Sequence, residues 1–416
     1  MEETVSEVED RRKEIMVLSD IALIVDCPHS TAPDEGEGYP LIRTPNIGKG
    51  RLLLDGVHRV SKEVYDLRNK RIIPQENDIL FAREAPAGNA AIISGGQQVC
   101  MGQRTVLIRP DLKKVNPHYL VYYILAPKQQ SRLLGYSHGA TVGHVNIPDI
   151  KNLEINIPEL TAQNKIANIL MTLDECVENN NKRIKILEQM AENLYKEWFV
   201  RFRFPEHEDV EFEGGIPKGW KICFLQDVFS FQEGPGIRNW QYVDSDGINF
   251  INIRCISNGD IKLDAASMIS KDEAYGKYSH FMLKENDIVM SCSGTLGRSA
   301  IVRRNHLPLC LNTSVIRFWP KLQQEDFSFL YGYLTSSEFI NRQREMASGS
   351  AQVNFGPVHL KKIRLLLPDE AVRRTFNDVL MPILDEEKTL RDKNLNLEKQ
   401  RDLLLPRLMS GKLQVK

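Results

Sequence analysis

The residue types best suited to chemistry are scattered along this chain and form no metal or disulfide motif. The seven cysteines are Cys27, Cys100, Cys176, Cys223, Cys255, Cys292 and Cys310. No two of them have the Cys-x-x-Cys spacing of a zinc ribbon, and an odd number does not fit a disulfide framework. The nine histidines include no His-Glu-x-x-His pair. The pattern predicts free thiols and no metal site.

One short motif, Asn116-Pro117-His118-Tyr119, resembles the Asn-Pro-Pro-Tyr element by which amino-group methyltransferases hold a flipped adenine. That task needs oxygen acceptors for the amine and an aromatic ring stacked on the base. Here His118 replaces the second proline, and no Gly-x-Gly turn between a strand and a helix follows to bind S-adenosylmethionine. The alternative interpretation is a helix that begins at Asn116, with Tyr119 in the core. Since no Walker loop is present either, we expect a non-catalytic chain.

Composition indicates an ordinary water-soluble protein with two or three domains. Of the 416 residues, 42% are hydrophobic and 26% are charged, and the formal net charge is −1. No apolar run approaches the roughly 18 residues that a membrane span needs. The acidic start has no secretory apolar stretch, so we expect a cytoplasmic protein. The neutral balance weakens the case for nucleic-acid binding without excluding it, because a basic face can exist on a neutral chain.

The chain contains an internal duplication of domain size. The Glu-Asn-Asp-Ile run at 76–79 returns at 285–288, and the register then holds with small slips. Tyr123 matches Tyr333, Gly139 matches Gly349 and Pro158 matches Pro368. Such a period is far longer than the roughly 20–50 residues of a solenoid repeat. The protein therefore offers two similar, non-identical surfaces. In each copy, short β-type runs bounded by Gly, Pro and Asn predict a compact α+β domain. In the first copy, one helix is expected from Tyr119 to about Leu134, and a strand at Leu153–Ile157.

A long helix is predicted between the two copies. Ten apolar or seam positions follow a 4-3-4-3 spacing from Ile166 to Trp198, with no Gly or Pro between Thr161 and Trp198. That spacing is typical of a coiled coil, and Asn180 on the seam is a candidate for fixing its register, although a solvated flank position explains it equally well. A second helix follows the second copy. Phe376, Ile383, Leu390, Leu397 and Leu404 recur every seven residues in it.

The second seam of this last helix is poorer in apolar residues. It is expected at Val372, Val379, Glu386, Lys393 and Gln400. Pro382 should kink the helix or delay its start, and Leu405-Pro406 should end it.

The predicted fold class is α+β: two duplicated globular domains separated by two long helices that form an antiparallel coiled coil with pseudo-two-fold symmetry. The predicted boundaries are 1–158 for the first domain, 159–203 for the central helix, 204–368 for the second domain and 369–416 for the C-terminal helix. The residues predicted to pair the helices or contact partner subunits are Ile166, Leu173, Asn180, Leu187, Leu194, Trp198, Phe199, Leu390, Leu397 and Leu404.

Differences between the copies indicate where a DNA duplex would be read. Sequence is read by polar side chains at base edges, while Lys and Arg contact phosphates. Arg83 and Arg104 match Cys292 and Ser314, so the two copies offer different groups at the same positions. Drift on a solvated surface explains any single difference equally well. The predicted DNA-binding residues are Lys49, Arg51, Arg83, Gln103, Arg104, His138, Thr141, Arg238, Asn239, Lys271, Lys277, Ser293 and Ser348.

Two stretches make the chain resemble the specificity subunits of type I restriction-modification systems. They are Leu194–Pro205, followed by Gly215-Ile216-Pro217-Lys218-Gly219-Trp220, and the C-terminal run 397–413. The first domain departs from the family because it lacks the Gly-Ile-Pro-x-Gly-Trp entry.

The resemblance implies two target-recognition domains that each read one half of an asymmetric bipartite DNA site. It also implies helices that set the spacing of the halves and dock two methyltransferase subunits. S-adenosylmethionine, ATP and Mg would be bound by those subunits and by restriction (translocase/nuclease) subunits. Two alternatives stay open: a self-contained DNA adenine methyltransferase, and a coiled-coil scaffold that does not bind DNA.

Overall fold

The protein is described by a computed structural model covering residues 16–135, 143–321, 323–347 and 355–415. Its contacts divide the chain into two compact units. Unit 1 comprises residues up to Glu178 together with Leu395 onward, and unit 2 comprises Asn179–Asn394. Each unit holds one α+β domain and a segment of both long helices, α5 (Leu160–Tyr195) and α11 (Glu370–Met409). The predicted fold class is confirmed.

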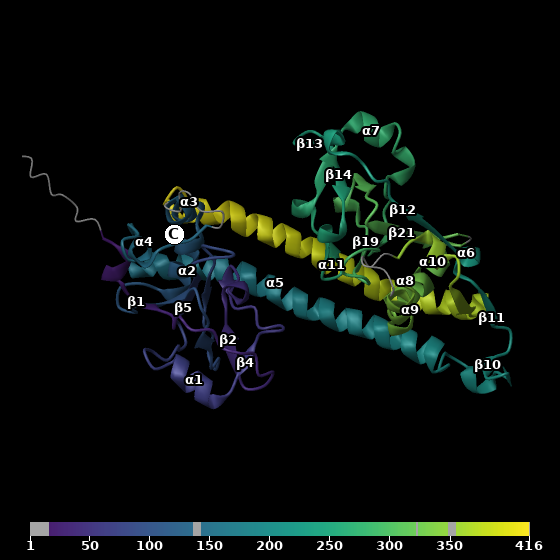
Figure 1. Cartoon of the computed structure of the whole chain (residues 1–416), viewed down its shortest axis with the longest axis horizontal. Coiled ribbons are helices and arrows are strands. Elements are labelled where there is room, and N and C mark those ends of the chain that lie inside the picture. Colours follow the sequence, from purple (N-terminus) through teal and green to yellow (C-terminus); the bar gives the residue numbers. More distant parts are fainter. Residues whose placement is uncertain (1–15, 136–142, 322, 348–354, 416) are drawn as a thin grey trace, which may run out of the picture. The chain divides into compact units, whose positions relative to one another are not determined.

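Unit 1 is built on a five-stranded sheet in the order β1-β8-β5-β6-β3. A second sheet has the order β4-β2-β7. The strands are β1 (Ala22–Asp26), β2 (Tyr39–Ile42), β3 (Gly50–Arg51), β4 (Arg59–Val60), β5 (Ile79–Ala82), β6 (Ala90–Ile92), β7 (Cys100–Met101) and β8 (Thr105–Pro110). The helices are α1 (Lys62–Arg68), α2 (Pro117–Leu125), α3 (Pro127–Gly135) and α4 (Ile147–Lys151). Apolar side chains of β5, β8, α2 and α5 share one core. Figure 1 shows α2 beside α5.

Unit 2 repeats this plan. Its main sheet has the order β12-β21-β18-β19, and a second sheet has the order β13-β17-β14-β20. The strands are β9 (Phe212–Glu213), β10 (Ile216–Pro217), β11 (Lys221–Phe224), β12 (Phe229–Glu233), β13 (Tyr242–Val243), β14 (Ile248–Ile251), β15 (Ile256–Ser257), β16 (Asp260–Ile261), β17 (Ser267–Ile269), β18 (Ile288–Ser291), β19 (Ser299–Ile301), β20 (Leu309–Leu311), β21 (Val315–Pro320) and β22 (Arg364–Leu367). The helices are α6 (Leu225–Val228), α7 (Lys271–Tyr275), α8 (Phe327–Thr335), α9 (Ser337–Ala347) and α10 (Pro357–Leu360).

Two local predictions in the first domain are wrong. The single helix expected from Tyr119 to about Leu134 is two helices, because Pro127 lacks an amide proton and holds Ala126 in an extended conformation. The strand expected at Leu153–Ile157 is reduced to one bridge, between Glu154 and Val17. Its counterpart in unit 2, β22, is a regular strand that pairs with β11.

The apolar seam of α5 is confirmed. Ile166, Leu170, Val177, Ile184, Ala191 and Trp198 are buried, and Leu173, Asn180, Leu187 and Leu194 are half-buried. After Tyr195 the helix widens into one π-helical turn, Lys196–Val200. This turn places Trp198 and Phe199 against Phe376 at the start of α11, with ring centroids 5.3 and 4.6 Å away. These two aromatic residues therefore lie in the core of unit 2.

The first predicted seam of α11 is confirmed, with Leu390 buried and Leu397 and Leu404 half-buried. The second predicted seam is wrong, because Val379, Lys393 and Gln400 are exposed. The second seam of α11 instead consists of Leu380, Glu387, Asn394, Arg401 and Leu408, which are also seven residues apart. Three of these five residues are polar: Glu387, Asn394 and Arg401. We refer to these three residues as the polar stripe of α11.

Both proline predictions for α11 also need correction. The helix begins at Glu370 and continues through Pro382, so the start is not delayed. Pro382 is exposed, and the turns on either side of it are held by the buried Phe376, Leu380 and Leu384. The helix passes Pro406 and ends at Met409, because Leu408 packs into the core of unit 1 and compensates for the missing hydrogen bond.

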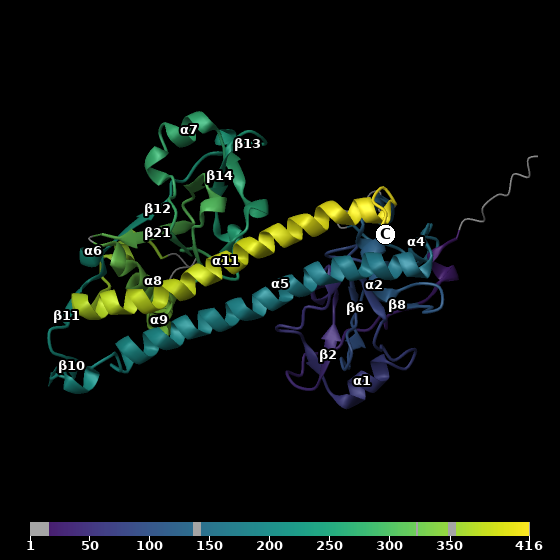
Figure 2. The same cartoon turned by 180° about the vertical axis from the view of Figure 1, so that it is seen from behind.

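Asn394 and Arg401 of the polar stripe contact α5 of the same unit directly, and Glu387 is linked to it through Arg391. In unit 2, Asn394 accepts a hydrogen bond from Asn180 at 2.8 Å and donates to Asn181 at 2.9 Å. In unit 1, Arg401 lies 2.8 Å from Asp174, which also accepts from the hydroxyl of Tyr122. In unit 2, residues further along α5 contact residues nearer the start of α11, so the two segments run antiparallel (Figure 2).

An ion-pair network also fastens α11 to the α+β domain of unit 2. Arg303 donates to Asp260 at 3.2 Å, and its Nε lies 2.9 Å from Asp392 of α11. Burial alone would raise the pKa of the Asp260 carboxyl. The hydrogen bond from His306 and the charge of Arg303 outweigh burial, so that pKa lies well below its ordinary range. Asp260 is therefore a charged anchor at neutral pH.

We predict that Asn394→Ala will lower the free energy of unfolding of unit 2 by about 1–2 kcal/mol, because Asn180 and Asn181 lose their buried partner. All four tryptophans, at positions 198, 220, 240 and 319, belong to unit 2, so urea unfolding followed by tryptophan fluorescence reports on that unit. The matched control is Asn396→Ala, which changes an exposed asparagine of the same helix and should have no comparable effect. Equal losses in the two variants would contradict a structural role for the Asn394 hydrogen bonds.

Candidate nucleic-acid interface

The two α+β domains share one backbone frame at the end of the main sheet where the predicted reading residues lie. In unit 1, the Arg83 amide donates to the Arg104 carbonyl at 2.9 Å, and Val145 donates to the Arg83 carbonyl at 3.0 Å. In unit 2, the Cys292 amide donates to the Ser314 carbonyl at 3.0 Å, and Phe355 donates to the Cys292 carbonyl at 2.8 Å. The frame thus carries different side chains at equivalent points.

In unit 1 the frame carries a charged cluster. Arg83 donates to the Val145 carbonyl at 2.9 Å, and its terminal nitrogens lie 2.8 Å from His144 and 3.5 Å from Asp26. The His144 ring contacts Glu84 at 2.6 Å on its other side. Arg83 is only 13% exposed, so it positions its neighbours and is poorly placed to reach a phosphate.

Other predicted residues of unit 1 are more accessible. Arg104 pairs with Glu84 at 2.9 Å, yet its side chain is 64% exposed. Gln103 is half-buried and donates to the His29 carbonyl. Lys49 and Arg51 are exposed on either side of Gly50, at the edge of the sheet opposite β1.

In unit 2 the same frame is nearly uncharged. Ser314 is held by Asn312 and accepts from the Ile253 amide at 3.3 Å, and Ser293 is half-buried. Burial and the nearby Glu233 raise the pKa of the Cys292 thiol to about 12, so Cys292 is a neutral thiol at physiological pH. Burial likewise raises the pKa of the Glu233 carboxyl. The frame of unit 2 therefore differs from that of unit 1 because its hydrogen-bond donors and acceptors carry no net charge.

The second sheet of unit 2 presents an aromatic and basic surface that the sequence only partly predicted. Arg238 and Asn239 are exposed, and Trp240 beside them is 75% exposed. This short turn is fixed from below by Gln241, which donates to Glu273 at 2.7 Å and to the Tyr278 hydroxyl at 3.0 Å. An aromatic ring beside an arginine and an asparagine, in a segment that follows Gly234 and Gly236, was the available sequence signal.

The other residues predicted to bind DNA are Lys271, Lys277, His138, Thr141 and Ser348. Lys277 is exposed, with its ammonium 5.2 Å from the centre of the Tyr278 ring. Lys271 is exposed and ion-paired with Asp246. His138, Thr141 and Ser348 lie outside the residues that the structure describes.

The methyltransferase-like motif has a structural role. Asn116 caps α2 by accepting from the Tyr119 amide at 2.9 Å, and its amide nitrogen donates to Asn164 at 2.8 Å. Tyr119 is 1% exposed. Neither side chain can therefore receive a flipped base in this conformation, which agrees with the helix-start interpretation.

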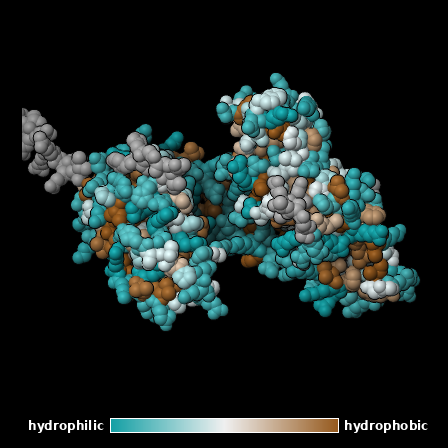
Figure 3. Space-filling model, viewed as in Figure 1, coloured by the Kyte–Doolittle hydropathy of each residue, from teal (hydrophilic) through white to brown (hydrophobic). Residues whose placement is uncertain are grey.

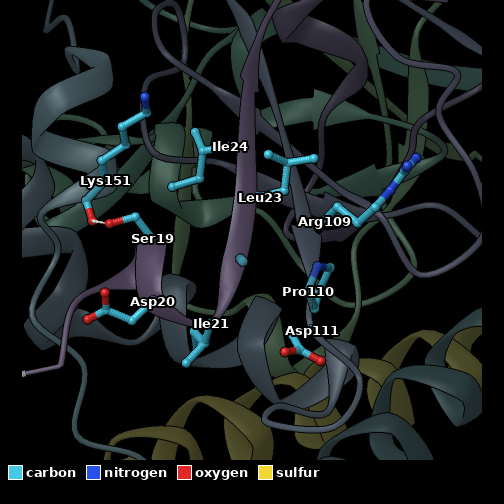
Figure 4. Close-up of a pocket in the computed structure, with 10 residues that line it drawn as sticks. Ser19, Asp20, Ile21, Leu23, Ile24, Arg109, Pro110, Asp111 and Lys151 are labelled. Atoms are coloured by element: carbon cyan, nitrogen blue, oxygen red, sulfur yellow. Dashed lines mark hydrogen bonds between the residues drawn. The ribbon is translucent and has the colours of Figure 1, made fainter.

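A groove of about 760 Å³ in unit 1 is lined by the edge strand β1 and the end of β8 (Figure 4). It is shallow, and Leu23 and Ile24 face it beside Arg109. Arg109 is already engaged by both carboxylate oxygens of Asp78, at 2.7 Å each. Ser19 closes one end by donating to the Lys151 carbonyl. The groove offers few polar groups that converge on one ligand.

Most of the surface in the space-filling view is hydrophilic (Figure 3). Across the described ranges, no helix combines the length and apolar character needed to cross a membrane.

Comparison with known proteins identifies the family of this chain. The family model described as "Type I restriction modification DNA specificity domain" matches residues 12–189 and again residues 217–385. The chain belongs to this family. Since the model matches twice, the internal duplication is a pair of specificity domains.

Two curated relatives come from Methanocaldococcus jannaschii. The type I restriction enzyme MjaVIII specificity subunit is 26% identical over 396 residues, which cover 94% of this chain and 89% of the relative. The MjaIX specificity subunit is 25% identical over 373 residues, covering 86% and 83%. Among solved structures, the S subunit of the type I restriction-modification system from M. genitalium is similar in fold. Its TM-score is 0.54 at 15% identity, with 96% of this chain and 97% of that chain covered.

The first specificity domain contains a largely buried arginine, Arg83, and an accessible one, Arg104. We predict that Arg83→Met will destabilise unit 1 by roughly 1–3 kcal/mol, because Asp26, His144 and the Val145 carbonyl each lose one partner in a half-buried site. Amide hydrogen exchange of β5 and β8 measures this effect in unit 1 separately from unit 2. The matched variant Arg104→Met removes an exposed guanidinium from the same frame and should change protection far less. The reverse order would contradict the assignment of Arg83 as a positioning residue.

Proposed function

We propose that this chain is the sequence-specific DNA-recognition subunit of a type I restriction-modification complex. Each specificity domain reads one half of an asymmetric bipartite site. The observation that carries the proposal is the shared backbone frame with different side chains. The first frame has the charged Arg83, Glu84 and Arg104, and the second has the neutral Cys292 and Ser314. One scaffold that presents two sets of donors and acceptors fits a target with two different halves.

Contacts to phosphates would come from exposed cations around the two frames. Arg104, Lys49 and Arg51 in unit 1, and Arg238 and Lys277 in unit 2, have exposed side chains. The exposed Trp240 ring adds a surface for stacking or for a wedge between bases. Because phosphate contacts release counterions, DNA binding should weaken as the salt concentration rises.

The long helices would set the distance between the half-sites and dock two methyltransferase subunits. Outside their buried seams, α5 and α11 expose the apolar side chains of Ile186, Met190 and Val379 in unit 2. Such residues are candidates for a subunit interface. Those partner subunits, and restriction subunits that translocate and cleave DNA, would bind S-adenosylmethionine, ATP and Mg. The complex would act on double-stranded DNA in the cytoplasm.

We predict that replacing residues 17–158 by the first domain of another family member will change only one half of the recognised site. Mapping modified adenines in cells that carry the chimaera together with the methyltransferase subunits measures this. The reciprocal exchange of residues 204–368 is the control and should change only the other half. Loss of all modification by a folded chimaera that still assembles, or a change in both halves, would count against independent reading.

We also predict that removing one heptad from each helix, residues 176–182 of α5 and 393–399 of α11, will shorten the preferred gap between half-sites. Seven residues at 1.5 Å span about 10 Å, or roughly three base pairs. The control replaces the exposed Cys176 and Lys399 by alanine within the same segments. An unchanged gap in a folded deletion variant would show that the helices do not set the spacing.

The scaffold alternative makes a different prediction for the first experiment. A chain that only joins partner subunits would assemble with them and leave the modified DNA sequence unchanged after either exchange. The methyltransferase alternative loses its basis in the motif, since Asn116 and Tyr119 serve the start of α2.

A further inference from the structure

A cavity of about 270 Å³ lies within unit 2, where α5, α11 and the edge strand β19 meet. Its walls include Glu188 and Glu192 of α5, Glu387 of the polar stripe and Tyr331 of α8. DNA reading at the sheet ends does not involve these side chains.

Acidic and basic side chains both surround the cavity, and Arg298 is part of its wall. Arg391 donates to Glu188 at 2.7 Å, to Glu387 at 2.8 Å and to the Asn258 carbonyl at 3.0 Å. One guanidinium therefore serves two carboxylates. Lys196 lies 2.5 Å from Glu192. Burial raises the pKa of the Glu188 carboxyl above its ordinary value, although the charges of Arg391 and Lys185 oppose the rise. Neither lysine belongs to the cavity wall.

Glu387 is the buried carboxylate whose hydrogen bonding is incomplete. It is 6% exposed, and its second oxygen, Oε2, is buried without a hydrogen-bond partner. An unpaired buried carboxylate oxygen is costly in free energy. Glu188 alone could neutralise Arg391, so the ion pair does not by itself explain a second glutamate.

The duplication provides an internal comparison. Pro158 matches Pro368 and Tyr123 matches Tyr333, so Glu387 corresponds to Val177 and Tyr331 to Val121. Both valines are buried in unit 1, at 6% and 1% exposure. The same fold is therefore built with apolar residues at these positions, and the acidic cavity is an addition confined to unit 2.

We propose that this cavity binds an organic cation, the alkylammonium or alkylguanidinium group of a free polyamine or of a Lys or Arg side chain on a protein partner. Glu387 Oε2 accepts a hydrogen bond from the cation, and Glu188 and Glu192 add negative charge. The Tyr331 ring contributes an aromatic wall that suits a cationic group. The alkyl part lies along the apolar side chains of β19.

The test uses the full chain labelled with 3-fluorotyrosine and titrated with n-butylguanidinium at constant ionic strength. Fluorine NMR follows Tyr331, whose signal is assigned with Tyr331→Phe. We expect a saturable shift with a dissociation constant on the order of millimolar, as befits one charged group. The uncharged n-butylurea, of the same shape, should leave the signal in place. Equal shifts with both compounds would refute a cation site.

Variants locate the binding determinant. Glu387→Gln should weaken n-butylguanidinium binding at least about tenfold, the change that loss of one charge-assisted hydrogen bond predicts. The matched control, Glu386→Gln, removes the neighbouring carboxylate, which pairs with Arg183 at 2.6 Å, and should bind normally. Thr335→Met fills the cavity without removing a charge and should also abolish binding. Tryptophan fluorescence verifies that each variant is folded. Unchanged affinity in folded Glu387→Gln would refute Glu387 as the acceptor and with it the proposed site.

Two further arms distinguish the source of the cation. Tighter saturation by spermidine than by n-butylguanidinium would assign the site to a free polyamine. Loss of the n-butylguanidinium response when a methyltransferase subunit is added would assign it to a partner side chain. Only this last arm rests on the proposed function, so its failure can be told apart from failure of the cavity to bind a cation.

Discussion

The pairing of α5 with α11 is the interaction on which both units depend. Each unit contains a segment of both helices, so neither α+β domain completes its core with its own sequence neighbours alone. In unit 1, Leu408 from the end of the chain packs with Ile166 and Leu170. In unit 2, Phe376 and Leu380 pack with Trp198 and Phe199. Each core is therefore closed only when its own segment of the C-terminal helix is in place.

This pairing is specified by polar contacts as much as by apolar ones. A purely apolar seam can slide by a heptad with little change in buried area, whereas a buried hydrogen bond is satisfied in one register only. Asn394 meets Asn180 and Asn181, Arg401 meets Asp174, and Glu387 shares Arg391 with Glu188. The three layers use three different chemistries, so a shifted register would leave each of them unmatched.

The two specificity domains show how one backbone serves two purposes. The hydrogen bonds between backbone groups at the sheet ends are the same in both units, while the side chains that they carry differ in charge. A backbone frame does not depend on side-chain identity, so its exposed side chains can vary without loss of the fold. The acidic cavity around Glu387 extends this asymmetry to the helices, because unit 1 has Val177 at the matching position.

The sequence by itself determined the duplication, the α+β class and the long helix α5. These features follow from repeated runs and from an apolar period uninterrupted by Gly or Pro, which are local properties of the chain. The break between α2 and α3 is also encoded locally, at Pro127, although the spacing of apolar residues predicts one helix there.

Only the tertiary structure decided which face of α11 is buried and which arginine is accessible to solvent. In the sequence, Glu386, Lys393 and Gln400 were as plausible for the second seam as Glu387, Asn394 and Arg401. The choice depends on Asp174, Asn180 and Glu188 of α5, which are some two hundred residues away along the chain. Arg83 and Arg104 likewise look alike in the sequence. The fold surrounds Arg83 with Asp26 and His144 and leaves Arg104 largely exposed, because burial and pairing are set by segments distant in the chain.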